Sequence, residues 1–301
     1  MKIEQLSLRQ DRADVTLTAY IQDARAGEQG ERCRPAVLIC PGGAYCFCAD
    51  TESEPVALRF CAMGFNAFVV RYATVYGSGV ERIEGPVMYE RRWYPTALLD
   101  VARAMRAIVD RAHPWQVDVA HIAIAGFSAG GHMAALFATR WHEPGLWRAA
   151  ELHGGPVRPT AAILGYMVGD ECFQSDDTDC EGVRSSERVR HVMKRALAGD
   201  DPGRDVLRDL MPARLVGPQT PPTFLWGTAS DATISPINIL SMAQALAHQE
   251  IPFELHVFAE GPHGLSLASR ESASSDEMIR SEVAVWVSLA ECWLENRGVL
   301  V

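Results

Sequence analysis

A serine between glycines, followed later in the chain by an aspartate and a histidine, is the pattern in this sequence best suited to chemistry. Ser128 stands in Gly-Phe-Ser-Ala-Gly (126–130), Asp231 in Gly-Thr-Ala-Ser-Asp (227–231) and His263 in Glu-Gly-Pro-His-Gly (260–264). A serine hydroxyl becomes a nucleophile at neutral pH when a histidine takes its proton, and a carboxylate fixes the tautomer of that histidine. The order serine, acid, histidine therefore predicts Ser128 as nucleophile, Asp231 as acid and His263 as base.

The segments around Ser128 predict a strand, a sharp turn and a helix. An apolar run, Ile122–Ala125, precedes the motif, and an alanine-rich stretch, Ala129–Arg140, follows it. Gly-x-Ser-x-Gly alone should occur by chance in about one chain of this composition in ten, so the argument depends on this setting. Strand, turn and helix together predict a nucleophile elbow, in which the serine hydroxyl is exposed on a strained turn.

Acyl transfer also requires hydrogen-bond donors for the oxyanion that forms on the substrate. One expected donor is the backbone N–H of Ala129, directly after the nucleophile. The loop Pro-Gly-Gly-Ala-Tyr (41–45) follows another apolar run, Ala36–Cys40, and its adjacent glycines allow backbone N–H groups to turn toward one point. We therefore expect Gly43 and Ala44 to complete the oxyanion hole.

Some residues near these motifs have a second interpretation. Tyr45, Phe127 and Met167 are candidates for lining the acyl pocket, although apolar residues near a site are more often part of the core. His132 lies four residues after Ser128 on the expected helix, so its side chain should point into the packing under the turn. We interpret His132 as structural.

Apolar runs of strand length alternate with helical patterns along the whole chain. We expect strands at 15–20, 36–40, 67–70, 122–125, 161–164, 223–226 and 253–258, and helices at 54–63, 96–111, 129–140, 235–248 and 276–295. This alternation predicts an α/β fold with a mostly parallel sheet of about eight strands and helices on both faces. No linker divides the chain, so we expect a single domain over residues 1–301.

Two segments interrupt the alternation. Residues 75–93 are rich in glycine and charge, and residues 166–220 combine an acidic loop, 170–181, with a basic helical stretch, 184–195. Both follow expected strands at the end where α/β enzymes place their binding loops. They are candidates for a small lid or rim, or equally for surface decoration or the contact of a homodimer.

Composition argues against several classes of partner. The 301 residues carry a formal net charge of -10, which disfavours nucleic acid and anionic membranes as partners. No apolar run reaches the length of a membrane span, and the first residues lack the apolar core of a signal peptide, so we expect a cytoplasmic protein. The eight cysteines form no Cys-x-x-Cys pair or zinc pattern with histidine, and we expect no metal and no cofactor.

The motifs together resemble the α/β-hydrolase superfamily, in particular its small acetylesterases and carboxylesterases related to hormone-sensitive lipase-like and acetylxylan-type esterases. The resemblance spans residues 35–295 and includes Gly-Phe-Ser-Ala-Gly-Gly-His (126–132), Pro-Gly-Gly-Ala-Tyr (41–45), Pro-Pro-Thr-Phe-Leu-Trp (221–226) and Gly-Pro-His-Gly (261–264). It implies Ser128, Asp231 and His263 as the triad. Relatives often have His-Gly-Gly-Gly in the oxyanion loop, where this chain has Pro41 and Ala44, but backbone donors survive both changes.

Three hypotheses follow for function. The first is a serine esterase acting on small-molecule esters with short acyl groups, with acetylated sugars as candidates, through an acyl-enzyme. The second keeps the triad and cleaves amides or peptides. The third is a non-catalytic binding protein on a hydrolase scaffold, because a fold does not determine function.

Overall fold

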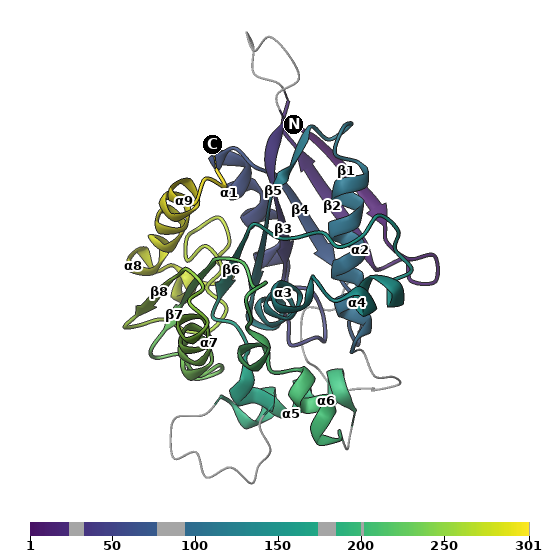
Figure 1. Ribbon diagram of the computed structural model, residues 1–301. Coiled ribbons are helices and arrows are strands. Elements are labelled where there is room, and N and C mark those ends of the chain that lie inside the picture. The colour runs from purple at the N-terminus through teal and green to yellow at the C-terminus, as the bar shows by residue number, and fades with distance from the viewer. Residues whose placement is uncertain (24–32, 77–93, 174–184, 200–201, 301) are drawn as a thin grey trace.

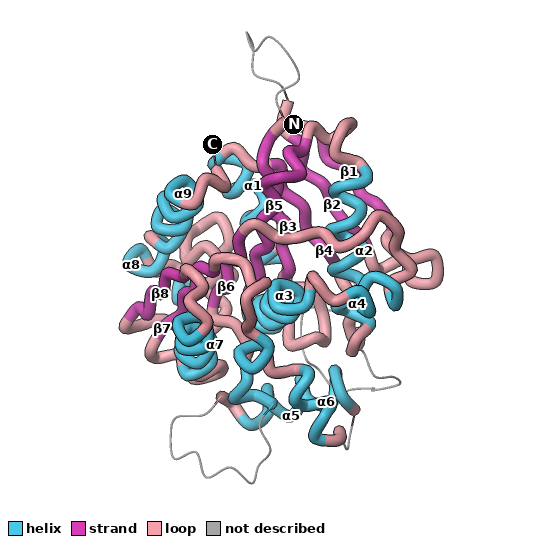
Figure 2. Tube along the Cα trace, in the orientation of Figure 1, coloured by secondary structure: helices cyan, strands magenta, loops and turns pink. Residues whose placement is uncertain are grey.

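A central sheet of eight strands carries helices on both faces in the computed structural model (Figure 1, Figure 2). The structure describes residues 1–301 with the exception of 24–32, 77–93, 174–184, 200–201 and 301. The strands are β1 (Lys2–Ser7), β2 (Thr16–Ile21), β3 (Arg34–Cys40), β4 (Asn66–Arg71), β5 (Val117–Phe127), β6 (Ala161–Gly165), β7 (Thr223–Thr228) and β8 (Phe253–Phe258).

The strands lie in the order β1-β2-β4-β3-β5-β6-β7-β8, and six of them, from β4 to β8, run parallel. In the described sheet, the antiparallel pairings are β1 with β2 and β2 with β4. The apolar runs in the strands from β4 to β7 are explained by this position, because a parallel strand covered on both faces is shielded from water. The edge strand β8 is only partly buried. The expected mostly parallel sheet with helices on both faces is confirmed. The sequence did not predict β1, whose polar side chains are largely exposed at the sheet edge.

Helices divide between the two faces of the sheet. Side chains of α2 (Thr96–Asp110), α3 (Ser128–Arg140) and α7 (Ile237–His248) pack in one apolar cluster, and those of α1 (Glu54–Met63) and α9 (Trp286–Asn296) pack in the other. The remaining helices are α4 (Pro144–Ala149), α5 (Glu187–Ala198), α6 (Arg204–Asp209) and α8 (Ser281–Ala284). Figure 1 shows α5 and α6 at the bottom of the molecule, away from both termini.

The helix predicted over 276–295 is wrong as a single element. The chain forms a 3-10 turn, Asp276–Met278, then α8, then α9. Arg280 adopts an extended conformation, and its N–H donates to the carbonyl oxygen of Ala268 at 2.8 Å instead of to a carbonyl one turn earlier. The apolar spacing was nevertheless informative, since Val283, Trp286 and Trp293 all face the sheet.

Candidate active site

Ser128 lies on the sharp turn between β5 and α3, with a φ of 50°. This left-handed conformation is uncommon outside glycine and persists where the surrounding structure holds it. Gly130 makes room for the turn, because a Cβ at this position would lie 2.0 Å from the carbonyl oxygen of Cys40. The expected strand, turn and helix are therefore present, and the turn packs directly against the end of β3.

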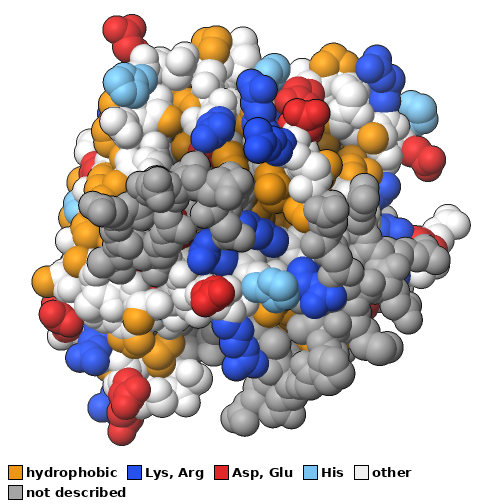
Figure 3. Space-filling model, turned by 90° about the horizontal axis from the view of Figure 1, so that it is seen from below, with side chains coloured by type: hydrophobic (Ala, Val, Ile, Leu, Met, Phe, Trp, Pro, Cys, Tyr) orange, Lys and Arg blue, Asp and Glu red, His pale blue; other side chains and the backbone are white. Residues whose placement is uncertain are grey.

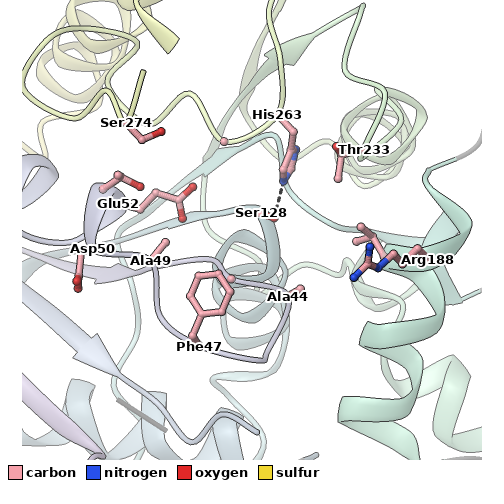
Figure 4. A pocket seen from close by; sticks show the side chains of 14 residues that line it. Ala44, Phe47, Ala49, Asp50, Glu52, Ser128, Arg188, Thr233, His263 and Ser274 are labelled. Carbon is pink, nitrogen blue, oxygen red and sulfur yellow. Dashed lines mark hydrogen bonds between the residues drawn. The ribbon is translucent and has the colours of Figure 1, made fainter. Parts of the chain in front are cut away.

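The structure brings Ser128, His263 and Asp231 together in one hydrogen-bonded chain. Ser128 Oγ lies 2.8 Å from His263 Nε2 (Figure 4). His263 Nδ1 lies 2.7 Å from Asp231 Oδ2. Asp231 and His263 stand on the loops after β7 and β8, as the parallel topology predicts for neighbouring strands. A carboxylate can only accept, so Nδ1 carries the proton and Nε2 is free to accept from the serine hydroxyl.

The carboxylate of Asp231 is held by backbone hydrogen bonds as well as by its contact with His263. Its side chain is buried, at 4% exposure, and its Oδ1 accepts the N–H groups of Thr233 at 2.8 Å and Ile234 at 2.9 Å. The ring of Tyr166 packs edge-on against His263, with ring centroids 5.1 Å apart. The carboxylate and the imidazole are thus held in place before any substrate binds.

The loop after β3 presents backbone N–H groups beside Ser128. Gly43 has a φ of 123° and Ala44 a φ of 54°, and both line the same cavity as the serine. Within the described part of the chain, no atom accepts a hydrogen bond from the N–H of Gly43 or Ala44. Ala129 follows the nucleophile in the first turn of α3, where backbone N–H groups have no partner in the helix. These three groups are suited to an oxyanion.

A buried carboxylate, which the sequence reasoning missed, holds this loop. Glu52 is 3% exposed; its Oε2 accepts the N–H of Gly42 at 2.6 Å and its Oε1 accepts the hydroxyl of Tyr166 at 2.7 Å. Tyr166 in turn accepts the N–H of Ser266 at 2.9 Å. Burial raises the pKa of Glu52, and the hydrogen bonds from Tyr166 and Gly42 oppose that rise.

A cavity of about 720 Å³ opens above the serine. Its walls come from the oxyanion loop, the 3-10 turn Asp50–Glu52, the histidine loop and the start of α5. The lining residues are Gly43, Ala44, Phe47, Ala49, Asp50, Thr51, Glu52, Ser128, Arg188, Val189, Thr233, His263, Gly264 and Ser274. This volume suits a small-molecule substrate.

The expectation that Tyr45, Phe127 and Met167 line this pocket is wrong. All three side chains are fully buried, and none of them borders the cavity. Tyr45 packs beneath the loop and donates its hydroxyl to His132 Nδ1 at 2.5 Å, because His132 Nε2–H donates to the carbonyl oxygen of Leu210. The structural interpretation of His132 is confirmed, and its burial lowers its pKa to about 4.

The structure describes the two segments that interrupt the alternation of strands and helices, 75–93 and 166–220, to different extents. Residues 77–93 of the first segment lie outside the described residues. In the second, Arg188 and Val189 at the start of α5 form part of the cavity wall. This part of the segment therefore borders the cavity; its role as a lid or rim and the homodimer contact remain predictions.

Within the described ranges, no group of three or more His, Cys, Asp or Glu side chains is placed to hold a metal ion. No helix among those residues has both the length and the apolar character that a bilayer crossing requires. The cytoplasmic location remains a prediction.

The sheet order, the elbow after β5 and the loops after β7 and β8 define the α/β-hydrolase fold. Solved structures agree with this assignment. A carboxylesterase, Cest-2923 from Lactobacillus plantarum WCFS1, superposes with a TM-score of 0.81 at 29% identity, covering 100% of this chain and 99% of that one. An acetyl ester-xyloside bifunctional hydrolase from Caldicellulosiruptor lactoaceticus gives a TM-score of 0.75 at 28% identity, covering 99% and 97%.

The chain belongs to the BD-FAE family, whose model matches residues 26–246. Among curated relatives, endo-1,4-beta-xylanase B of Butyrivibrio fibrisolvens is 30% identical over 79% of this chain and 33% of its own length. Esterase LipQ of Mycobacterium tuberculosis is 23% identical over 74% of this chain and 50% of its own length. The matches therefore span between a third and a half of these two relatives.

Proposed function

We propose that the protein is a serine hydrolase that cleaves short-chain carboxylic esters, acetyl esters in particular, through an acyl-enzyme. The observation that carries the proposal is the contact of 2.8 Å between Ser128 Oγ and His263 Nε2, continued by the contact of 2.7 Å to Asp231. A serine in this arrangement can lose its proton to the histidine at neutral pH.

The reaction proceeds in two halves. Ser128 Oγ attacks the ester carbonyl carbon while His263 Nε2 takes its proton, and the N–H groups of Gly43, Ala44 and Ala129 stabilise the oxyanion. The tetrahedral intermediate collapses, the C–O bond to the alcohol breaks, and the alcohol leaves with the proton from His263. Water then attacks the acyl-enzyme by the same route and releases the acid. No step requires a metal or a cofactor.

The comparisons support an ester as the bond and leave the alcohol open. One structural neighbour is named a carboxylesterase and another an acetyl ester-xyloside hydrolase. A curated match to a shorter part of the chain is an acetylxylan esterase of Xylanibacter ruminicola, 28% identical over 44% of this chain. Acetylated sugars are therefore the substrate class we propose to test after simple esters.

The decisive experiment compares the wild type with Ser128→Ala on p-nitrophenyl acetate. We expect kcat/KM to fall by at least about 10³-fold, because the nucleophile is absent and only binding and the oxyanion donors remain. Ser241→Ala on α7, outside the cavity, is the matched control and should retain the wild-type rate.

Two further measurements separate the remaining hypotheses. A fluorophosphonate probe should label the wild type and not Ser128→Ala, whereas a non-catalytic binding protein would remain unlabelled. A matched acetanilide should be cleaved far more slowly than the ester. Equal rates on the two substrates would favour an amidase, and equal turnover by Ser128→Ala would overturn the assignment of the nucleophile.

A further inference from the structure

Arg188 places a positively charged side chain in the wall of the cavity that holds Ser128. It is the second residue of α5, its side chain is exposed, and it borders the cavity together with Val189. No carboxylate of the described residues forms an ion pair with it. By contrast, other arginines of the chain, such as Arg103 and Arg140, are paired with nearby acids.

The acidic side chains of the cavity lie on the opposite side and are already engaged. Figure 4 shows Asp50 and Glu52 across the cavity from Arg188, with Ser128 between them. Asp50 pairs with Arg71, and both carboxylate oxygens of Glu52 accept hydrogen bonds from the protein. Both acids already have partners, and Arg188 is the arginine among the residues that line the cavity.

The sequence of α5 is rich in basic residues although the whole chain is acidic. The 12 residues of α5 include four Lys or Arg residues and one Glu, against a formal net charge of -10 for the chain. Figure 3 looks onto the end of the molecule that carries α5, and Lys and Arg side chains gather near its middle. These basic side chains favour the approach of an anion along α5.

We propose that Arg188 binds a carboxylate on the alcohol part of the substrate, so that the preferred substrates are acetyl esters of anionic alcohols such as sugar acids. The planar guanidinium can donate to both oxygens of a carboxylate, and its single positive charge balances the single negative charge of that carboxylate. An acetyl group is uncharged, which assigns the anion to the alcohol part. This inference rests on the proposed function, since it requires ester hydrolysis at Ser128.

The test uses two esters that differ in one substituent, 4-acetoxybenzoate and 4-acetoxybenzamide. They have the same shape and the same acetyl ester bond, and only the first carries a negative charge. We expect Arg188→Gln to reduce the preference for the carboxylate, measured as the ratio of the two kcat/KM values, by about tenfold, mainly through KM. Arg188→Glu should lower the ratio further. Raising the salt concentration should reduce the wild-type preference, because ions screen an exposed pair.

Arg297→Gln is the matched control. It removes the same charge from a residue just after α9, which Figure 1 places at the end of the molecule away from α5, and Arg297 does not border the cavity. An equal fall in the ratio for Arg297→Gln, or an unaltered ratio for Arg188→Gln, would overturn the role of Arg188 while ester hydrolysis stands. Failure of the wild type to hydrolyse either ester would instead overturn the proposed function.

Discussion

Glu52 shows how a single buried carboxylate can set the position of the oxyanion loop. One of its oxygens accepts the N–H of Gly42, next to the two donors proposed for the oxyanion, and the other accepts the hydroxyl of Tyr166, which packs on His263. A Cβ added to Gly42 would lie 2.8 Å from Glu52 Oε2 and 2.9 Å from Ser128 Cβ, so the loop passes closely between them. Glu52 is therefore a positioning residue that acts through the backbone.

We predict that Glu52→Gln lowers kcat on p-nitrophenyl acetate by about tenfold and changes KM by less than about twofold. Glu52 accepts from Gly42 on one oxygen and from Tyr166 on the other, and glutamine replaces one of these oxygens by an NH2 group that only donates. One of the two bonds is therefore lost in its present geometry, and a displaced loop stabilises the transition state less well. Steady-state kinetics of the purified variant give both constants.

Tyr166→Phe is the control for a merely structural effect. It removes the hydroxyl that Glu52 accepts and leaves the bond to Gly42 in place. We expect a smaller loss of kcat from Tyr166→Phe than from Glu52→Gln at a comparable loss of thermal stability. If the loss of kcat in each variant were instead proportional to its loss of thermal stability, the result would argue against positioning of the loop by Glu52.

The residues of the proposed triad were more predictable than the residues that support them. Ser128, Asp231 and His263 could be chosen because each follows a recognisable strand in a glycine-containing loop. Glu52 could not be chosen, because its partner Tyr166 lies 114 positions away in the sequence and no local pattern indicates that the two side chains meet. Tyr45, Phe127 and Met167 were misplaced for a related reason: closeness to a motif in sequence does not distinguish the cavity wall from the core beneath it.

At the scale of elements, the sequence pattern located the buried strands, whereas packing determines the edge strand and the helix boundaries that the pattern does not reveal. Apolar runs located six of the eight strands, and the alternating stretch 15–20 located β2. The edge strand β1 has no such signal. Periodicity also joined the 3-10 turn Asp276–Met278 to the helices that follow it, because it cannot detect that the N–H of Arg280, just before α8, binds the carbonyl oxygen of Ala268.

Asp170 links two elements of the 166–220 segment and leads to a prediction about pH. It lies in the 3-10 turn Asp170–Phe173, and its Oδ1 accepts the N–H of Ala213 at 2.9 Å. Burial raises the pKa of Asp170 to about 6 in the folded protein. Asp170 therefore binds its proton more tightly in the folded than in the unfolded chain. The protonated side chain stabilises the fold fully below about pH 4, and this contribution to the free energy of unfolding is lost as the pH rises to about 6.

We predict that Asp170→Asn removes this part of the pH dependence. Asparagine can still accept from Ala213 and never ionises, so the variant should gain roughly 1–3 kcal/mol in free energy of unfolding relative to the wild type between pH 4 and pH 7. Urea unfolding at pH 4, 5, 6 and 7 measures the difference, with Asp205→Asn on α6 as the control for loss of one negative charge. A difference between Asp170→Asn and wild type that is the same at pH 4 and pH 7 would contradict the prediction.

At the scale of the molecule, the sheet joins two apolar clusters into one unit. Along β3, Leu38 packs in the cluster under α2 and α3, whereas Val37 and Ile39 pack in the cluster under α1 and α9. Loss of either cluster would expose side chains of the strands that support the other. We therefore predict that the described sheet and its helices unfold in a single cooperative transition, as expected for one domain over residues 1–301.

Tryptophans on both faces allow a direct measurement. Trp115 packs in the first cluster, and Trp226 and Trp286 stack in the second with ring centroids 4.8 Å apart. In protein labelled with 5-fluorotryptophan, each indole gives its own fluorine NMR signal, which Trp→Phe variants assign. The native signals of Trp115 and Trp286 should disappear at the same urea concentration, and circular dichroism at 222 nm should give the same midpoint. Loss of the Trp286 signal while that of Trp115 persists would mean that the two faces fold independently and that the chain is divided into more than one cooperative unit.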